Sequence, residues 1–136
     1  MNNTRFATAL HILTLLADNK DEWLSSEWIA GSININPVVV RKELSVLNEA
    51  GLVTSRKGKM GGTTLAKKSE DITLDSIYLA VKNSDVLGKR NSNPSPKCPI
   101  GREINQKLDG LFTKIDQSVI DELKGKTLEG FVAEFH

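Results

Sequence analysis

The order of local signals between residues 36 and 67 constrains the fold more than any other feature of this sequence. Asn36 can cap a helix with its side-chain oxygen, and Pro37 suits the first helical position because no backbone donor is needed there. Apolar side chains follow at spacings of four and three residues, at Val40, Leu44 and Leu47. Gly51 is a stop signal, since glycine readily adopts the left-handed conformation that ends many helices. The segment therefore predicts a helix over about residues 36–50.

The residues after Gly51 indicate a β-hairpin. The runs LVTSR and TTLAK are short and partly β-branched, and the sequence KGKMGG separates them. Glycine in such a connection permits a tight turn and lets the main chain approach a neighbouring group closely. We therefore expect a two-stranded wing with a basic tip over about residues 53–67.

Apolar periodicity predicts further helices over about residues 4–17, 26–33, 74–82, 100–123 and 127–135. The expected caps of the first three are Asn3 or Thr4, Ser25 or Ser26, and Thr73. Residues 83–99 contain three prolines, three serines and three asparagines, which is typical of a loop. The predicted fold is mainly α with a small β-hairpin: a winged helix-turn-helix domain over 1–82, a loop over 83–99, and a long dimerisation helix with a short C-terminal helix over 100–136.

A short helix, a tight turn, a second helix and a hairpin in this order suit double-stranded DNA. A helix of about a dozen residues fits the major groove, where its first turns face the base edges. A basic hairpin beside it can lie along the backbone or in the minor groove. We therefore expect a sequence-specific DNA-binding regulator, with residues 36–50 as the recognition helix and 53–67 as the wing.

The charge distribution agrees with this interpretation. Residues 37–68 carry seven basic and two acidic side chains, a net charge of +5, whereas the whole chain has a net charge of +1. A basic block in an otherwise slightly acidic chain is typical of a polyanion site, although a solvated charged face gives the same count. The alternative function is a protein-interaction module on a winged-helix scaffold that binds no operator.

The sequence also resembles the Rrf-type winged-helix transcriptional regulators of bacteria, over nearly the whole chain. The resemblance is carried by 29–30 (IA), 36–41 (NPVVVR), Leu47, 50–53 (AGLV), Gly58, 61–62 (GG), 65–67 (LAK) and 72–74 (ITL). The sequence CPIG at 98–101, followed by a long predicted helix, is similar to the sensing loop and dimer helix of a branch that lacks the three-cysteine iron–sulfur motif. The resemblance implies a homodimer that binds a palindromic operator through two winged helices, and we expect it to act as a repressor.

Ten residues are predicted to contact DNA. Arg41 lies one turn into the recognition helix, where it can reach a guanine edge with two hydrogen bonds; a phosphate contact or a solvated side chain is the alternative. Lys42 and Ser45 are predicted phosphate contacts. The remaining candidates are Asn36 and Val38 at the start of the same helix, and Arg56, Lys57, Lys59, Gly61 and Gly62 in the wing.

The predicted helix from residue 100 to 123 carries an apolar stripe with nothing obvious to cover in the N-terminal domain. At 1.5 Å per residue this helix is roughly 35 Å long. We expect the stripe to form the dimer interface, and intramolecular packing is the alternative. Its residues are Ile104, Leu108, Leu111, Ile115, Val119 and Leu123.

Cys98 is the one cysteine of the chain, so it forms no intramolecular disulfide and implies no oxidising compartment. The cluster-binding relatives use three cysteines in this loop, and an iron–sulfur cluster usually takes four ligands, so no cluster is expected here. Lys97, Arg102 and the start of a helix would favour the thiolate. Cys98 is therefore a candidate redox or electrophile sensor, and an inert cysteine in a turn is the alternative.

Other signals are few. The sequence shows no metal motif, no catalytic Ser/His/Asp set and no phosphate loop, so we expect neither a cofactor nor an enzyme. The apolar stretch over residues 6–17 is interrupted by polar residues and lacks a cleavage site, which indicates an amphipathic helix and a cytoplasmic protein. Trp23 and Trp28 flank the second predicted helix and are expected in the core or at a domain junction.

Overall fold

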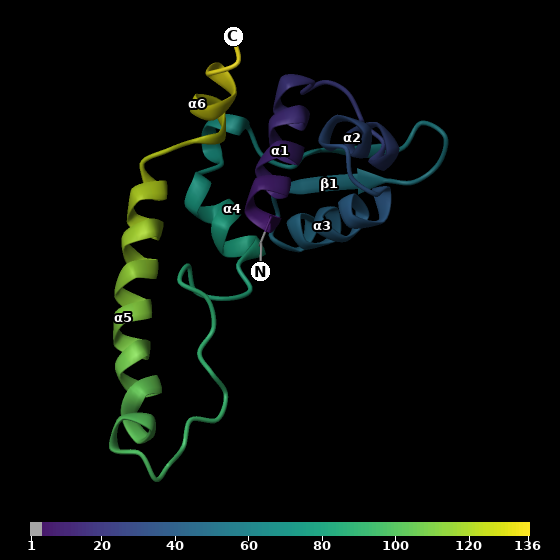
Figure 1. Cartoon of the computed structure of the whole chain (residues 1–136). Helices are drawn as coiled ribbons and strands as arrows, with labels where there is room; N and C mark the ends of the chain where they lie inside the picture. The colour runs from purple at the N-terminus through teal and green to yellow at the C-terminus, as the bar shows by residue number, and fades with distance from the viewer. Residues whose placement is uncertain (1–3) are drawn as a thin grey trace.

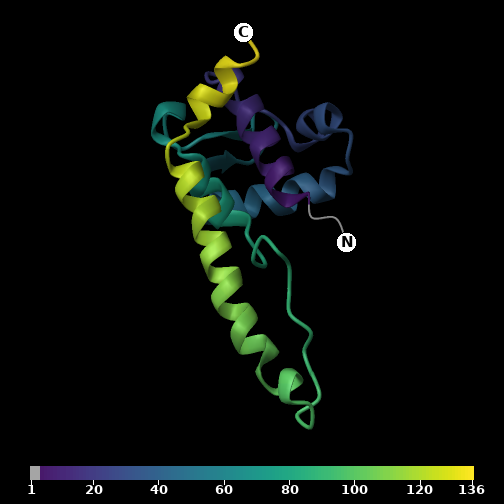
Figure 2. The same cartoon turned by 60° about the vertical axis from the view of Figure 1, so that its left-hand side comes forward.

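The computed structural model describes residues 4–136 and consists mainly of helices with one two-stranded antiparallel hairpin, as predicted. The elements, in chain order, are α1 (Arg5–Asp18), α2 (Ser26–Ile33), α3 (Pro37–Glu49), β1 (Val53–Arg56), β2 (Gly62–Leu65), the 3-10 helix η1 (Ser69–Asp71), α4 (Leu74–Val81), α5 (Pro99–Lys124) and α6 (Leu128–Ala133). Figure 1 shows a body that contains every element except α5. The helix α5 projects from this body as an arm, and the segment 82–98 runs beside it (Figures 1 and 2).

The local signals around the helix-turn-helix are confirmed. The side-chain oxygen of Asn36 accepts a hydrogen bond from Val38 N at 2.9 Å, and that of Ser25 accepts one from Trp28 N at 3.1 Å. Gly51 has a φ of +77°, as expected of a residue that follows a helix in the left-handed conformation. Thr4 and Thr73 occupy the N-cap positions of α1 and α4, but neither side chain makes a cap hydrogen bond. The other predicted cap of α1, Asn3, lies outside the described residues.

The hairpin is extended by one residue that precedes α2. Strands β1 and β2 pair from Val53 with Leu65 to Arg56 with Gly62. Leu24 then pairs with Thr63 on the other edge of β2, through N–O distances of 3.0 and 2.9 Å. This pairing fixes the wing beside the start of α2.

The core joins the N-terminal helices to the C-terminal one. Its fully buried side chains include Ile12, Leu13, Leu16, Ile29, Leu47, Leu52, Ile72, Ile77 and Leu128. Leu128 comes from α6, and its backbone N–H donates to Ile72 O at 2.8 Å. The helix α6 therefore packs with the body, whereas the predicted division at residue 99 grouped it with the arm. Trp28, which was expected in the core or at a domain junction, is 50% exposed.

An ion pair fixes α3, the predicted recognition helix, to α1. The guanidinium of Arg5 donates to both carboxylate oxygens of Glu43, with each N–O distance 3.0 Å. Glu43 is buried in the face that α3 presents to the body. The hydrogen bond to Glu43 raises the pKa of Arg5. Sequence periodicity did not indicate this pair, because its members are 38 residues apart.

A buried carboxylate holds the base of the arm. Asp116 of α5 accepts hydrogen bonds from the Tyr78 hydroxyl at 2.5 Å, from the Lys82 ammonium, and from Val86 N at 3.4 Å. Burial by itself raises the pKa of Asp116, but the hydrogen bonds from Lys82 and Tyr78 outweigh it and leave that pKa below its usual value. Asp116 thus ties α5 to α4 and to the segment that follows α4.

A second cluster continues along the arm. Arg90 forms ion pairs with Asp85 and Asp109, and its guanidinium lies 5.3 Å from the centre of the Phe112 ring. The segment 82–98 is therefore attached to one side of α5. Among residues 4–136, no helix is long and apolar enough to cross a membrane.

Candidate nucleic-acid interface

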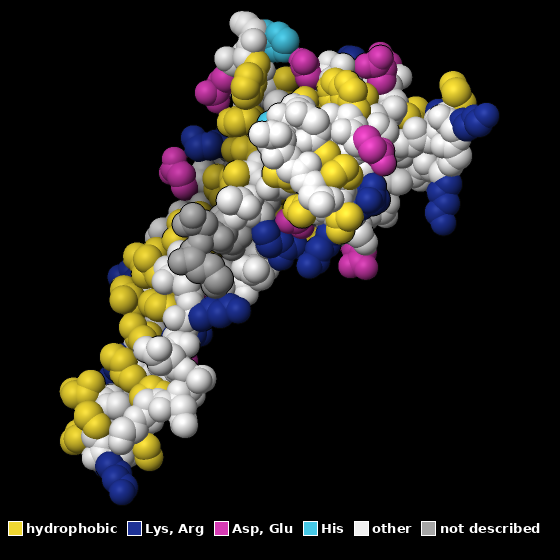
Figure 3. Space-filling model, turned by 45° about the vertical axis from the view of Figure 1, so that its right-hand side comes forward, with side chains coloured by type: hydrophobic (Ala, Val, Ile, Leu, Met, Phe, Trp, Pro, Cys, Tyr) yellow, Lys and Arg dark blue, Asp and Glu magenta, His cyan; other side chains and the backbone are white. Residues whose placement is uncertain are grey.

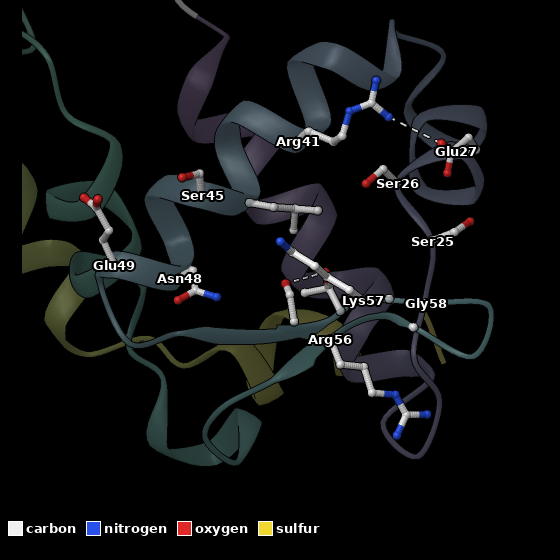
Figure 4. A pocket seen from close by; sticks show the side chains of 15 residues that line it. Ser25, Ser26, Glu27, Arg41, Ser45, Asn48, Glu49, Arg56, Lys57 and Gly58 are labelled. Atoms are coloured by element: carbon white, nitrogen blue, oxygen red, sulfur yellow. Dashed lines mark hydrogen bonds and ion pairs between the residues drawn. The ribbon is translucent and has the colours of Figure 1, made fainter.

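A groove lies between α3 and the hairpin, and the start of α2 closes one end of it. Arg41, Ser45, Asn48 and Glu49 line it from α3, and Figure 4 shows the hairpin on the opposite side. From α2 and the residue before it come Ser26, Glu27 and Ser25. The hairpin contributes Ser55, Arg56, Lys57, Gly58, Gly61, Gly62 and Thr63.

The structure brings six of the ten predicted DNA-contact residues into this groove: Arg41, Ser45, Arg56, Lys57, Gly61 and Gly62. Asn36 and Val38 lie just outside it at the start of α3, where Val38 is exposed. Lys42 is exposed on α3 outside the groove lining, and Lys59 is exposed at the tip of the wing. All ten therefore belong to α3, its cap or the hairpin.

The groove also contains residues that the sequence analysis did not single out as site residues. Ser25, Ser26 and Glu27 belong to the start of α2, and Asn48 and Ser55 line the groove from α3 and β1. The cap signal at Ser25 marked the start of α2 correctly. It could not show that this helix end meets the recognition helix, since that contact depends on the turn between them.

Arg41 is held by a residue of α2. Its Nη1 donates to Glu27 Oε1 at 3.3 Å, and Figure 4 shows this contact spanning the space between the two helices. The two side chains are 53% and 71% exposed. A solvent-exposed ion pair of this kind contributes little to stability, so breaking it costs little free energy. Both side chains can therefore reach a ligand in the groove.

Arg56 is held within the wing. Its Nε donates to Met60 O at 3.0 Å, and its guanidinium lies 4.2 Å from the centre of the Trp23 ring. The hydrogen bond to Met60 and the cation–π contact with Trp23 hold the Arg56 side chain in one place, and they therefore stabilise the position of the hairpin. The other exposed cations near the tip of the wing are Lys57 and Lys59.

The glycine pair of the wing has a structural reason. A Cβ atom on Gly61 would lie 2.3 Å from Arg56 O, and one on Gly62 would lie 2.7 Å from Leu24 O. Both glycines are needed for close approach of backbone to backbone, within the hairpin at Gly61 and against Leu24 at Gly62. Gly58 at the tip has a φ of +101° and open space around it, so it forms the turn instead.

The basic block of the sequence is divided in space. Lys67 and Lys68 line a separate hollow with Glu70 and Glu129, apart from the groove residues. The acid Glu43 is buried against Arg5, so it contributes no exposed negative charge to α3. The exposed positive charge that faces the groove therefore comes from α3 and the wing alone.

The family model of Rrf2, described as “Iron-dependent Transcriptional regulator”, matches residues 2–134. The chain belongs to the Rrf2 family. The relative “Putative HTH-type transcriptional regulator YwnA” of Bacillus subtilis is 43% identical over 129 residues, which are 95% of each chain. “HTH-type transcriptional regulator NsrR” of Oceanobacillus iheyensis is 26% identical over 122 residues, 85% of this chain and 83% of that one.

Solved structures share the fold of this Rrf2-family chain. A crystal structure of “a putative DNA binding protein” has a TM-score of 0.74 and 40% identity, and covers 93% of this chain and 97% of its own. The structure of CymR, the global cysteine regulator of B. subtilis, has a TM-score of 0.71 at 23% identity, over 98% of this chain and 97% of its own, and supports the fold alone. Family and fold together make this chain a DNA-binding transcription regulator, a class whose members are not enzymes.

The family description names iron, but the residues of this Rrf2 chain do not fit an iron–sulfur cluster. Cys98 is its one cysteine, whereas a cluster usually takes four thiolate or imidazole ligands. Within the described part of the chain, no group of three or more His, Cys, Asp or Glu side chains could hold a metal ion. Cys98 is exposed at the N-cap position of α5, and its role as a sensor stays a prediction.

Proposed function

We propose that the chain acts as a homodimeric repressor on a palindromic operator, with α3 in the major groove and the hairpin along the backbone or in the minor groove. The observation that carries this proposal is the groove itself. It aligns Arg41 and Ser45 of the recognition helix with Lys57 of the wing on one open face. Such an arrangement offers one element to base edges and another to phosphates.

The arm supports the homodimer. Leu111 is 50% exposed, and the neighbouring stripe residues Ile104, Leu108, Ile115 and Val119 are only half-buried. The adjacent face of α5 is occupied by its own chain through Phe112 and Asp116. Figure 3 shows hydrophobic side chains gathered in a band along this arm. A second copy of α5 would cover the band, because exposed apolar surface of this extent favours association.

Leu123, the last of the six predicted interface residues, has a different place. It is packed against the core of its own body, so it contributes to the attachment of α5 within one chain. The stripe drifts around the helix because a spacing of four residues exceeds the helical repeat of 3.6 residues per turn. We therefore retain Ile104, Leu108, Leu111, Ile115 and Val119 as the proposed interface.

Symmetric pairing of two chains increases the affinity of this small DNA-binding body for DNA. One body offers few exposed cations to the backbone, and a dimer doubles them. Two recognition helices related by a two-fold axis would read half-sites about 34 Å apart, one turn of DNA. The expected cytoplasmic location is part of the same proposal, since the operator lies on chromosomal DNA.

The test is fluorescence polarisation with purified full-length chain and the DNA upstream of its own gene, at several salt concentrations, with light scattering to measure mass. We expect a dimer whose affinity falls steeply with salt, because each phosphate contact releases a counterion. An intact dimer with no salt-dependent DNA binding would contradict operator binding and favour a protein-interaction module. A monomer at micromolar concentration would contradict the proposed role of α5.

A further inference from the structure

Glu27 is an acid on a face that is proposed to meet a polyanion. It lies in the first turn of α2, and its carboxylate is 71% exposed within the groove. A negative charge at this place opposes the approach of phosphates, so its presence weakens binding to any DNA sequence. An acid that helps the dipole of α2 could equally well point away from the groove.

The direction in which Glu27 points is therefore informative. Its Oε1 accepts a hydrogen bond from Arg41 Nη1 at 3.3 Å, across the turn that joins α2 to α3. Figure 4 shows the guanidinium of Arg41 turned toward Glu27 above the groove. The structure gives one contact between the two side chains, through one nitrogen of the guanidinium.

A single contact leaves most of the guanidinium available. Arginine has five N–H donors in a planar fork, and recognition of guanine O6 and N7 needs two of them. A carboxylate that engages one terminal nitrogen fixes the plane of the fork and leaves other donors for the base. It also restricts a long side chain before binding, so less rotamer freedom is lost when the base contact forms.

We propose that Glu27 is a positioning residue that sets the base preference of Arg41. It orients the guanidinium toward guanine at the cost of general affinity for DNA. This inference rests on the proposed operator binding and adds a residue from α2 to the reading of bases by α3. It also explains why an exposed acid stands in a groove whose other charged residues near α2 are basic.

The experiment is a selection from randomised duplex DNA with full-length wild-type protein, followed by polarisation titrations on the best site and its single-base variants. The proteins are wild type, Glu27→Gln, Arg41→Ala, the double variant and Glu49→Gln. Glutamine keeps the size of the side chain and removes its charge. Glu49→Gln is the matched control, because Glu49 lines the same groove from the far end of α3, whereas the ion pair of Arg41 is with Glu27.

We expect Glu27→Gln to bind all sequences more tightly and to lose roughly 2–5-fold of the affinity ratio for guanine over other bases at one operator position, the range of an exposed ion pair. Arg41→Ala should alter the same position, and adding Glu27→Gln to it should change the ratio no further, because the two residues act as one unit. Glu49→Gln should tighten binding to every sequence by one factor and leave the ratio unchanged.

Two results would overturn the inference. One is a Glu27→Gln variant that behaves like Glu49→Gln, with uniform tightening and an intact base ratio. The other is a Glu27→Gln effect at a different base pair from that of Arg41→Ala, which would make Glu27 a direct reader of a base. Both results require wild-type protein that binds DNA with salt dependence and base preference. If wild type lacks these, the operator-binding proposal itself fails.

Discussion

Replacing Asp116 with alanine is expected to loosen the joint between the body and the arm. Asp116 is 4% exposed and accepts hydrogen bonds from the Tyr78 hydroxyl, the Lys82 ammonium and Val86 N. Removing its carboxylate leaves a half-buried ammonium and hydroxyl without this acceptor. Breaking a buried ion pair by removing one partner costs about 3–5 kcal/mol.

The structure argues for a value below that range. Lys82 Nζ also lies 3.4 Å from Asp85 Oδ1, and the Lys82 side chain is 26% exposed, so the ammonium keeps one partner and some water. We therefore expect a loss of about 2–3 kcal/mol in the free energy of unfolding. For a domain of this size the loss corresponds to a fall of roughly 6–12 °C in Tm.

The assay is thermal unfolding followed by circular dichroism, at one protein concentration because a dimer makes Tm concentration-dependent. Asp121→Ala is the matched control: it is the same substitution on the same helix, but Asp121 is 60% exposed and pairs with Lys124 at 3.7 Å. The control should stay within about 0.5 kcal/mol of wild type. Equal Tm values for the two variants would refute the assignment of Asp116 as the anchor of the joint.

The pH dependence of the unfolding free energy is a second test of the role of Asp116. The pKa of Asp116 is lower in the folded protein than in the unfolded chain, so its contribution to stability is present above the unfolded value, near pH 4, and is lost as the pH falls through the folded value. The difference in unfolding free energy between wild type and Asp116→Asn should therefore shrink between pH 7 and pH 3. A constant difference over that range would show that the charge of Asp116 is not what stabilises the joint.

Three further predictions concern the wing, the DNA contacts and the dimer. Gly62→Ala places a Cβ 2.7 Å from Leu24 O and should lower the free energy of unfolding by about 1–3 kcal/mol in chemical denaturation. The control Gly31→Ala meets open space in α2 and should be neutral or stabilising by up to about 1 kcal/mol. Equal effects of the two variants would show that close packing against Leu24 is not what requires Gly62. Lys59→Ala should weaken binding to all operators alike and reduce the slope of log K against log salt concentration by about one unit, while Arg41→Ala should relax the preference at one base pair. An effect of Lys59→Ala confined to one base pair would be evidence against a phosphate contact of Lys59. Leu111→Glu on the exposed stripe of α5 should give monomers by light scattering, while the control Gln106→Glu on another exposed side of the helix should stay dimeric. A dimeric Leu111→Glu variant would show that the dimer interface does not include this stripe.

The sequence by itself determined the helix-turn-helix and the wing. Asn36, Pro37 and Gly51 act on their own neighbours in the chain, through a cap hydrogen bond, a fixed φ and a left-handed stop. The hairpin followed from β-branched runs on either side of a glycine-rich turn. Such signals involve a few consecutive residues, so they can be seen before any tertiary contact is known.

Tertiary structure alone decided what the side chains near the site do. The predicted DNA contact Arg56 is held over Trp23, and the glycine pair 61–62 is required by contacts within the hairpin and with Leu24. Glu27 reaches Arg41 only because the turn between α2 and α3 brings two helix faces together. Residue types and spacing could not indicate these roles, since each depends on a partner from a different element.

The same distinction applies to the arm. Helical periodicity gave the apolar stripe of α5, but it could not separate the part proposed to face a second copy from Leu123, which packs into its own core. Nor could it assign Asp116, because a single acid on an amphipathic helix is most often solvated. A local pattern specifies the secondary structure and the faces of an element, whereas the partner of each face is fixed by contacts between residues far apart in the chain.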